Sequence, residues 1–212
     1  MVVTLLWDDA SVEDVVSGDG FLDALGPGGV HVSMSTISPE GSRRLAGKHA
    51  ERGCLFAEAP VFGRPDAAVA RQLWIPCAGP AAAKTRVRPI LEVMGAAGVF
   101  DFGEEVGAAT TVKLIGNFLI GAAARSLAEG LAAAEANGCA PKTVVAMLTT
   151  TLFPAPIYQS YGRMLAEKTL VMNPSQADIG RKDLGLFRAM AAEAGATTAM
   201  VDFMTGAPGP RR

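Results

Sequence analysis

A proline-free stretch from Val106 to Gly138 places the strongest constraint on the fold of this chain. Its apolar residues recur at helical spacing, which predicts one long helix of about thirty residues. Lys113 and Asn117 lie four residues apart within it, so both project from one face of the helix. Their neighbours are apolar, and a buried ammonium group is costly unless it is paired or used. The pair is therefore a candidate site, although a lysine that extends into solvent beside a hydrated asparagine also explains the pattern.

Before this helix, short apolar runs alternate with helical segments of about 10–15 residues. Such alternation indicates βαβ units and a parallel sheet. After Gly103 every periodic segment predicts a helix. We therefore expect an α/β part over residues 1–104 and an all-α part over residues 105–212. The strands are expected at residues 1–6, 30–34, 55–57, 72–78 and 99–102, and the main helices at 9–16, 39–52, 81–96, 106–138, 141–152, 155–167 and 175–194.

Composition and charge exclude several classes of function. The formal net charge is −2 and the arginine pairs are separate, so neither a nucleic acid nor a membrane is expected as a partner. The three cysteines are widely spaced without a CxxC motif, which suits reduced thiols in the cytoplasm and argues against a zinc site. No run of about eighteen apolar residues and no signal-peptide pattern occur. We therefore expect a soluble cytoplasmic protein without a metal ion.

Three short motifs follow predicted strands, where a parallel sheet usually binds its ligands. They are the segments Leu6 to Asp8, Met34 to Pro39 and Ala59 to Arg64. Each motif is weak alone, because a serine such as Ser38 before a helix is usually only its N-cap.

Together with the long helix, these motifs resemble the β-hydroxyacid dehydrogenase family, a 6-phosphogluconate dehydrogenase-like group that contains 3-hydroxyisobutyrate dehydrogenase and tartronate semialdehyde reductase. The resemblance covers residues 1 to about 195. It implies an oxidoreductase that moves a hydride between NAD or NADP and a small β-hydroxy acid, such as 3-hydroxyisobutyrate, or its semialdehyde. The matching residues are Ser-Thr-Ile-Ser-Pro at 35–39, Ala-Pro-Val at 59–61 with Gly63, Lys113 with Asn117, and Lys182-Asp183-Leu184.

The resemblance also implies an architecture and a role for each matching residue. Residues 1–104 correspond to the C-terminal part of a Rossmann-like NAD(P)-binding domain, and residues 105–212 to a helical domain for substrate binding and dimerisation, so a homodimer or higher homo-oligomer is expected. Imine reductases share this architecture but usually replace the catalytic lysine, so Lys113 argues against them. The implied catalytic residue is Lys113, the substrate-binding residues are Ser35, Gly63 and Asn117, and the cofactor-binding residues are Leu6, Ser11, Thr36 and Lys182.

The chain departs from the family pattern within two of the motifs. Phe62 replaces the usual serine, and Trp7 replaces the usual proline. Arg64 adds a planar cation that could bind a carboxylate or phosphate at two points, or could equally be a solvated loop residue. Lys182 could likewise be a plain surface lysine. His31 and His49 are assigned no functional role.

A larger departure concerns the cofactor phosphates. The sequence contains no GxGxxG, the loop that holds a pyrophosphate. We therefore expect a family member that is truncated at the N-terminus and altered at the C-terminus, with Val2–Leu6 as an open apolar sheet edge. Such an edge predicts poor solubility or oligomerisation. The alternative function is a non-catalytic remnant that acts as a dimerising helical scaffold.

Overall fold

The computed structural model describes residues 1–18, 20–95, 98–171 and 173–207. The chain divides into two compact units, and the division falls inside the two longest helices, α6 (Ala108–Ala136) and α9 (Pro174–Glu193). The assignment of residues 1–104 and 105–212 to separate functional domains stays a prediction. Unit 1 comprises Met1–Ile115 and Leu186–Thr197, and unit 2 comprises Gly116–Gly185 and Thr198–Arg212.

The strands of unit 1 form two parallel groups. The first is a three-stranded sheet in the order β1-β2-β3, with Val3 opposite Val32 and Val32 opposite Ala57. The second is a parallel pair, β4-β5, which an isolated antiparallel bridge between Glu58 and Ala78 joins to β3. The predicted parallel sheet is therefore confirmed. The strands are β1 (Val2–Thr4), β2 (Val30–Ser33), β3 (Leu55–Glu58), β4 (Trp74–Cys77) and β5 (Gly98–Asp101).

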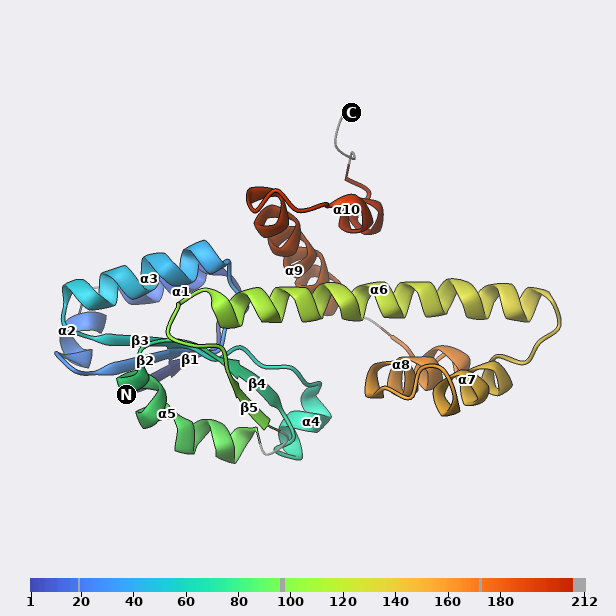
Figure 1. The fold of residues 1–212 in the computed structure, drawn as a ribbon, viewed down its shortest axis with the longest axis horizontal. Coiled ribbons are helices and arrows are strands. Elements are labelled where there is room, and N and C mark those ends of the chain that lie inside the picture. The colour runs from blue at the N-terminus through green and yellow to red at the C-terminus, as the bar shows by residue number, and fades with distance from the viewer. Residues whose placement is uncertain (19, 96–97, 172, 208–212) are drawn as a thin grey trace. The chain divides into compact units, whose positions relative to one another are not determined.

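Helices cover both faces of these strands. Helices α1 and α3 lie on one face and α5 on the other (Figure 1). Helix α1 begins after Asp8, whose carboxylate accepts from the Ser11 amide, and α3 begins after Ser38, whose hydroxyl accepts from the Gly41 amide. The expected end of α5 at Ala96 lies outside the described residues. The bounds are α1 (Asp9–Ser17), α2 (Phe21–Leu25), α3 (Pro39–Glu51), α4 (Pro65–Val69) and α5 (Ala81–Met94).

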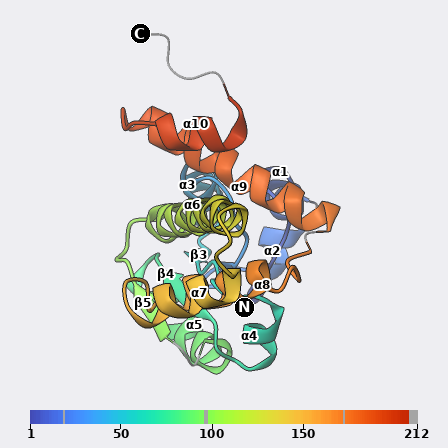
Figure 2. The same cartoon turned by 90° about the vertical axis from the view of Figure 1, so that its right-hand side faces the viewer.

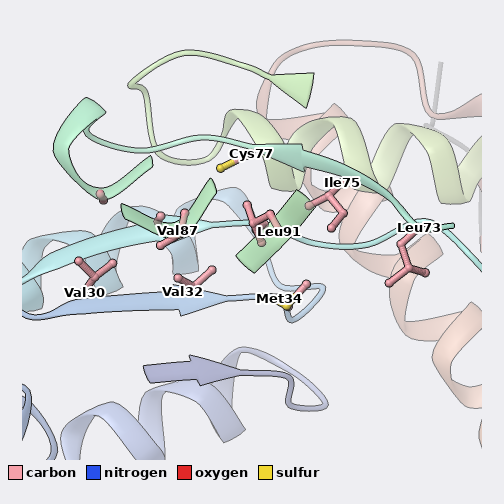
Figure 3. Close-up of a cluster of buried hydrophobic side chains, with 11 residues drawn as sticks. Val30, Val32, Met34, Leu73, Ile75, Cys77, Val87 and Leu91 are labelled. Atoms are coloured by element: carbon pink, nitrogen blue, oxygen red, sulfur yellow. The ribbon is translucent and has the colours of Figure 1, made fainter. Parts of the chain in front are cut away.

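The core of unit 1 follows the two-residue alternation of its strands. On one face of β2, Val30 and Val32 pack in one cluster with Val87 and Leu91 of α5 (Figure 3). Burial of each such side chain stabilises the fold by about 1.5–3 kcal/mol. On the opposite face His31 points toward α3, since successive strand residues face opposite sides.

The strand β4 contains Pro76, which cannot donate a backbone hydrogen bond. β4 pairs along its length with β5, while its other side makes only isolated bridges near its ends, at Trp74 and next to Cys77. Pro76 therefore occupies a place where no ladder is lost, in agreement with the predicted edge or interrupted strand.

The strand β1 lies at the end of its sheet and pairs with β2 among the described residues. Val3 is 44% exposed and Leu5 is 68% exposed. The expected open apolar edge at Val2–Leu6 is confirmed, and its effect on solubility stays a prediction.

Unit 2 is built from helices only, among its described residues. Helices α7 (Pro141–Thr150) and α8 (Pro156–Ala166) pack side by side (Figures 1 and 2). A Cβ at Gly162 would lie 2.8 Å from Val145 Cγ1, so glycine permits this close approach. A short helix, α10 (Ala199–Thr205), was not expected from the sequence.

The helix α6 has 29 residues, close to the predicted length. An α/β sheet followed by helices with one long member is the fold class expected from the sequence, and it is confirmed. None of the helices in the described part of the chain combines the length and hydrophobicity needed to span a bilayer.

Candidate active site

A side-chain hydrogen bond ties together the segments that follow β1 and β2. The Leu6 amide donates to Ser35 Oγ over 2.8 Å, and Ser35 is buried. A serine hydroxyl that accepts one bond keeps its own proton to donate. The structure thus brings together Leu6, Ser35 and the adjacent Thr36, three of the expected site residues, at the carboxyl ends of parallel strands.

The helix N-termini beside these strand ends are already engaged by carboxylates. Asp8 accepts from the Ser11 amide over 2.8 Å and from the Ser11 hydroxyl over 2.6 Å. Asp9 accepts from the amide and the hydroxyl of Ser38. A side chain at Gly41 would collide with Asp9, which explains the glycine. Ser11 therefore has an internal capping partner. The Asp9–Ser38 contact joins residues 29 positions apart and had no signal in the sequence.

The segment after β3 has a fixed backbone. Phe62 and Trp74 exchange two backbone hydrogen bonds of 2.8 and 3.0 Å. Gly63 follows at φ +148°, and a Cβ there would lie 2.5 Å from Leu73 Cδ2. Only glycine fits this position without displacement of Leu73. Arg64 is exposed at the start of α4.

Glu58 is a site residue that the sequence reasoning missed. It is fully buried at the end of β3 and accepts from the Gly107 and Ala109 amides over 2.9 and 2.7 Å. Its second oxygen accepts from the Thr110 hydroxyl over 3.1 Å. Burial raises the pKa of Glu58, although these hydrogen bonds act in the opposite direction. The carboxylate holds the first turn of α6, the helix that carries Lys113.

Lys113 is half-buried, and its Nζ lies over the Phe62 ring, 4.3 Å from the ring centroid. Both residues belong to unit 1. This distance lies within the range of a cation–π interaction. Phe62, which appeared in the sequence only as a departure from the family pattern, thus contacts the expected catalytic amine.

In unit 2, Asp183 connects two of the expected site residues. It is buried, and its Oδ2 accepts from Asn117 Nδ2 over 2.6 Å. Its Oδ1 lies 2.9 Å from Lys182 Nζ, and the Lys182 side chain is only 18% exposed. This burial disfavours the reading of Lys182 as a plain surface lysine. Asp183 belongs to the Lys182-Asp183-Leu184 motif of the sequence, but its contact with Asn117, 66 residues away, had no local signal.

The strand ends offer a partial fit to a nicotinamide cofactor. Leu5 and Trp7 expose apolar surface beside the hydroxyl-bearing Ser35–Thr36 segment, which suits the ring end of a dinucleotide. The GxGxxG motif that usually holds the phosphates does not occur in the 212 residues. Among the described residues, no group of three or more His, Cys, Asp or Glu side chains is placed to hold a metal ion.

Two curated relatives cover most of the chain. An uncharacterized oxidoreductase of Bacillus subtilis (strain 168), YfjR, is 41% identical over 192 residues, which are 90% of this chain and 66% of that protein. The 2-(hydroxymethyl)glutarate dehydrogenase of Eubacterium barkeri is 31% identical over 88% of this chain and 62% of its own length. The chain thus spans less than two thirds of both relatives.

Solved structures and a family comparison agree with the expected fold and cofactor class. The 3-hydroxyisobutyrate dehydrogenase of Salmonella typhimurium matches with a TM-score of 0.83 at 24% identity, covering 96% of this chain and 70% of that one. Residues 1–114 match the family described as the NAD binding domain of 6-phosphogluconate dehydrogenase. Because this match covers more than half of the sequence, the chain belongs to that NAD-binding family, and its resemblance to 3-hydroxyisobutyrate dehydrogenase-like oxidoreductases is confirmed.

Proposed function

We propose that the protein is an NAD(P)-dependent oxidoreductase that interconverts a small β-hydroxy acid, similar to 3-hydroxyisobutyrate, and its semialdehyde. The observation that carries this proposal is the half-buried amine of Lys113, held against an aromatic ring on a helix whose first turn is fixed by the buried Glu58. A lysine in such surroundings can act as a general acid or base.

In this proposal Lys113 moves the proton. A bound NAD(P) supplies the hydride to the carbonyl carbon or accepts it from the alcohol. During reduction the Lys113 ammonium gives one proton to the carbonyl oxygen, leaving a neutral amine and an alcohol. During oxidation the amine takes the hydroxyl proton. The balance of the reaction therefore needs no further group.

The remaining residues have binding roles in the proposal. The Ser35 hydroxyl and the Gly63 amide bind the substrate carboxylate, and Asn117 orients the substrate. The contacts of Leu6 and Ser35 and of Asn117 and Asp183 support a fixed orientation of these groups. Leu6, Ser11, Thr36 and Lys182 contact the cofactor.

The substrate class and the assembly are proposed from the likeness to relatives. The names of the relatives, 2-(hydroxymethyl)glutarate dehydrogenase and 3-hydroxyisobutyrate dehydrogenase, indicate hydroxy acids as their substrates. A cytoplasmic homodimer or higher homo-oligomer is proposed by the same likeness. The alternative, a non-catalytic scaffold, gives no reason for the contacts of Lys113 and Lys182.

Cofactor binding tests the proposal. The purified chain is titrated with NADPH and with NADH by fluorescence, and the titration is repeated with Lys182→Ala. Saturable binding that weakens in this variant is expected. Lys168→Ala is the matched control, because Lys168 also belongs to unit 2 and forms an exposed ion pair with Glu135. Absence of binding, or equal weakening in both variants, would contradict the proposed cofactor role.

A further inference from the structure

The ring of Phe62 stands on a backbone that has little freedom to move. Two backbone hydrogen bonds to Trp74 fix Phe62 on one side. On the other side Gly63 packs so close to Leu73 that a Cβ would lie 2.5 Å from Leu73 Cδ2. Phe62 itself is partly buried. The ring of Phe62 therefore forms an apolar wall beside Lys113 on a backbone that is held in place.

The position of the Phe62 ring determines which part of a bound substrate lies next to it. A proton passes between Lys113 and the reacting oxygen when the two heavy atoms are about 2.6–3.2 Å apart. Since Nζ is 4.3 Å from the ring centroid, the reacting oxygen lies within about 7.5 Å of that centroid. Substituents on the neighbouring carbon can then reach van der Waals contact with the ring.

We propose that Phe62 is a specificity-determining residue that selects substrates with an apolar substituent on the carbon next to the reacting carbonyl. The proposal rests on the proposed function, because it places the reacting oxygen at Lys113. A methyl group gains by burial against the ring. A hydroxyl group at the same place loses hydrogen bonds to water and gains no acceptor or donor from the ring.

The size of the effect follows from the similar shapes of the two groups. Methyl and hydroxyl differ little in volume, so an apolar site distinguishes them only through the cost of burying the hydroxyl. This cost corresponds to about 10- to 100-fold in kcat/KM. The matched substrates are 2-methyl-3-oxopropanoate and 2-hydroxy-3-oxopropanoate. They share the carboxylate and the aldehyde and differ only in this substituent.

The test compares both substrates in the wild type and three variants by following NADPH oxidation. The wild type is expected to prefer the methyl substrate by about tenfold or more. Phe62→Ser should abolish or reverse the preference, whereas Phe62→Leu, which keeps an apolar wall, should retain it. Phe100→Ser is the matched control, because Phe100 is an exposed phenylalanine of β5 in the same unit. An unchanged preference in Phe62→Ser would overturn the proposal.

A binding measurement separates this proposal from the proposed function. The Cε–Hε signal of Lys113, assigned with Lys113→Arg, should move upfield in the ring current of Phe62 and lose that shift in Phe62→Leu. Titration of the wild type with 3-hydroxy-2-methylpropanoate and with 2,3-dihydroxypropanoate then reports both affinities without turnover.

The outcomes of the two measurements distinguish the hypotheses. Selective binding of the methyl acid without turnover would support the Phe62 proposal and contradict hydride transfer by this chain. Turnover with equal affinity for the two hydroxy acids and equal kcat/KM for the two aldehydes would overturn the Phe62 proposal. The proposed oxidoreductase activity would still stand. Neither binding nor turnover would overturn both.

Discussion

The buried pair of His31 and His49 predicts that the protein loses stability in mild acid. The Leu45 carbonyl can only accept, so the contact of 2.7 Å makes His49 Nδ1 a donor. A neutral His49 then accepts at Nε2 from His31 Nδ1 over 3.0 Å, and His31 Nε2 accepts from the Thr4 hydroxyl over 2.9 Å. Both rings are therefore neutral, and each lies close to Phe56 and Phe21.

The magnitude follows from the pKa of His31. Burial, together with the neighbouring His49, lowers this pKa from 6.5 to about 3. Burial lowers the pKa of His49 as well. The unfolded chain therefore binds more protons below pH 6.5, and the free energy of unfolding falls with pH across the window from 6.5 to about 3. At pH 5 the loss from His31 alone is about 2 kcal/mol, since one pKa unit corresponds to about 1.36 kcal/mol.

Urea unfolding at pH 7.5 and pH 5.0 measures this loss. The wild type should lose about 2 kcal/mol or more between the two pH values, and His31→Phe should lose about 2 kcal/mol less than the wild type. The comparison uses the pH dependence within each protein, so the lower starting stability of the variant does not affect it. Equal losses in the two proteins would refute the neutral, buried His31.

Three further predictions concern packing and the sheet edge. Glu58→Ala leaves the donors at the start of α6 without their acceptor, so the free energy of unfolding measured in urea should fall by about 1–3 kcal/mol or more. A smaller decrease would show that Glu58 does not hold this helix. Gly63→Ala should lower the stability by about 1–3 kcal/mol in thermal scans, because the alanine Cβ would meet Leu73. An unchanged Tm would contradict the close packing at this turn. Val3→Lys places a charge on the open edge of β1 and should reduce self-association in sedimentation, whereas a wild type that is already monomeric would show that this edge does not associate.

Periodicity and helix caps were sufficient to predict the strands and the longer helices of the fold. The long helix, the five strands and the capping by Ser38 depend on local sequence, and all of them occur near the predicted positions. The short helices α2, α4 and α10 were not predicted, because helices of five to seven residues give little periodic signal.

The contacts of the candidate site depend on residues far apart in the sequence. Glu58 reaches the first turn of α6 across about fifty residues, and Asp183 meets Asn117 across 66 residues. The Phe62 ring lies over Lys113 on a backbone that is hydrogen-bonded to Trp74 of β4. Motifs in the sequence therefore indicated candidate residues but could not show these partners, because tertiary packing determines them.

Turnover by the wild type and by Lys113→Met gives the most direct test of Lys113 as the proton donor. Methionine has a similar length and no amine, so NADPH binding should persist. Reduction of 2-methyl-3-oxopropanoate should proceed in the wild type and fall by about 10²- to 10⁴-fold in the variant. Equal kcat in both proteins, at equal affinity for NADPH, would contradict a catalytic role of Lys113.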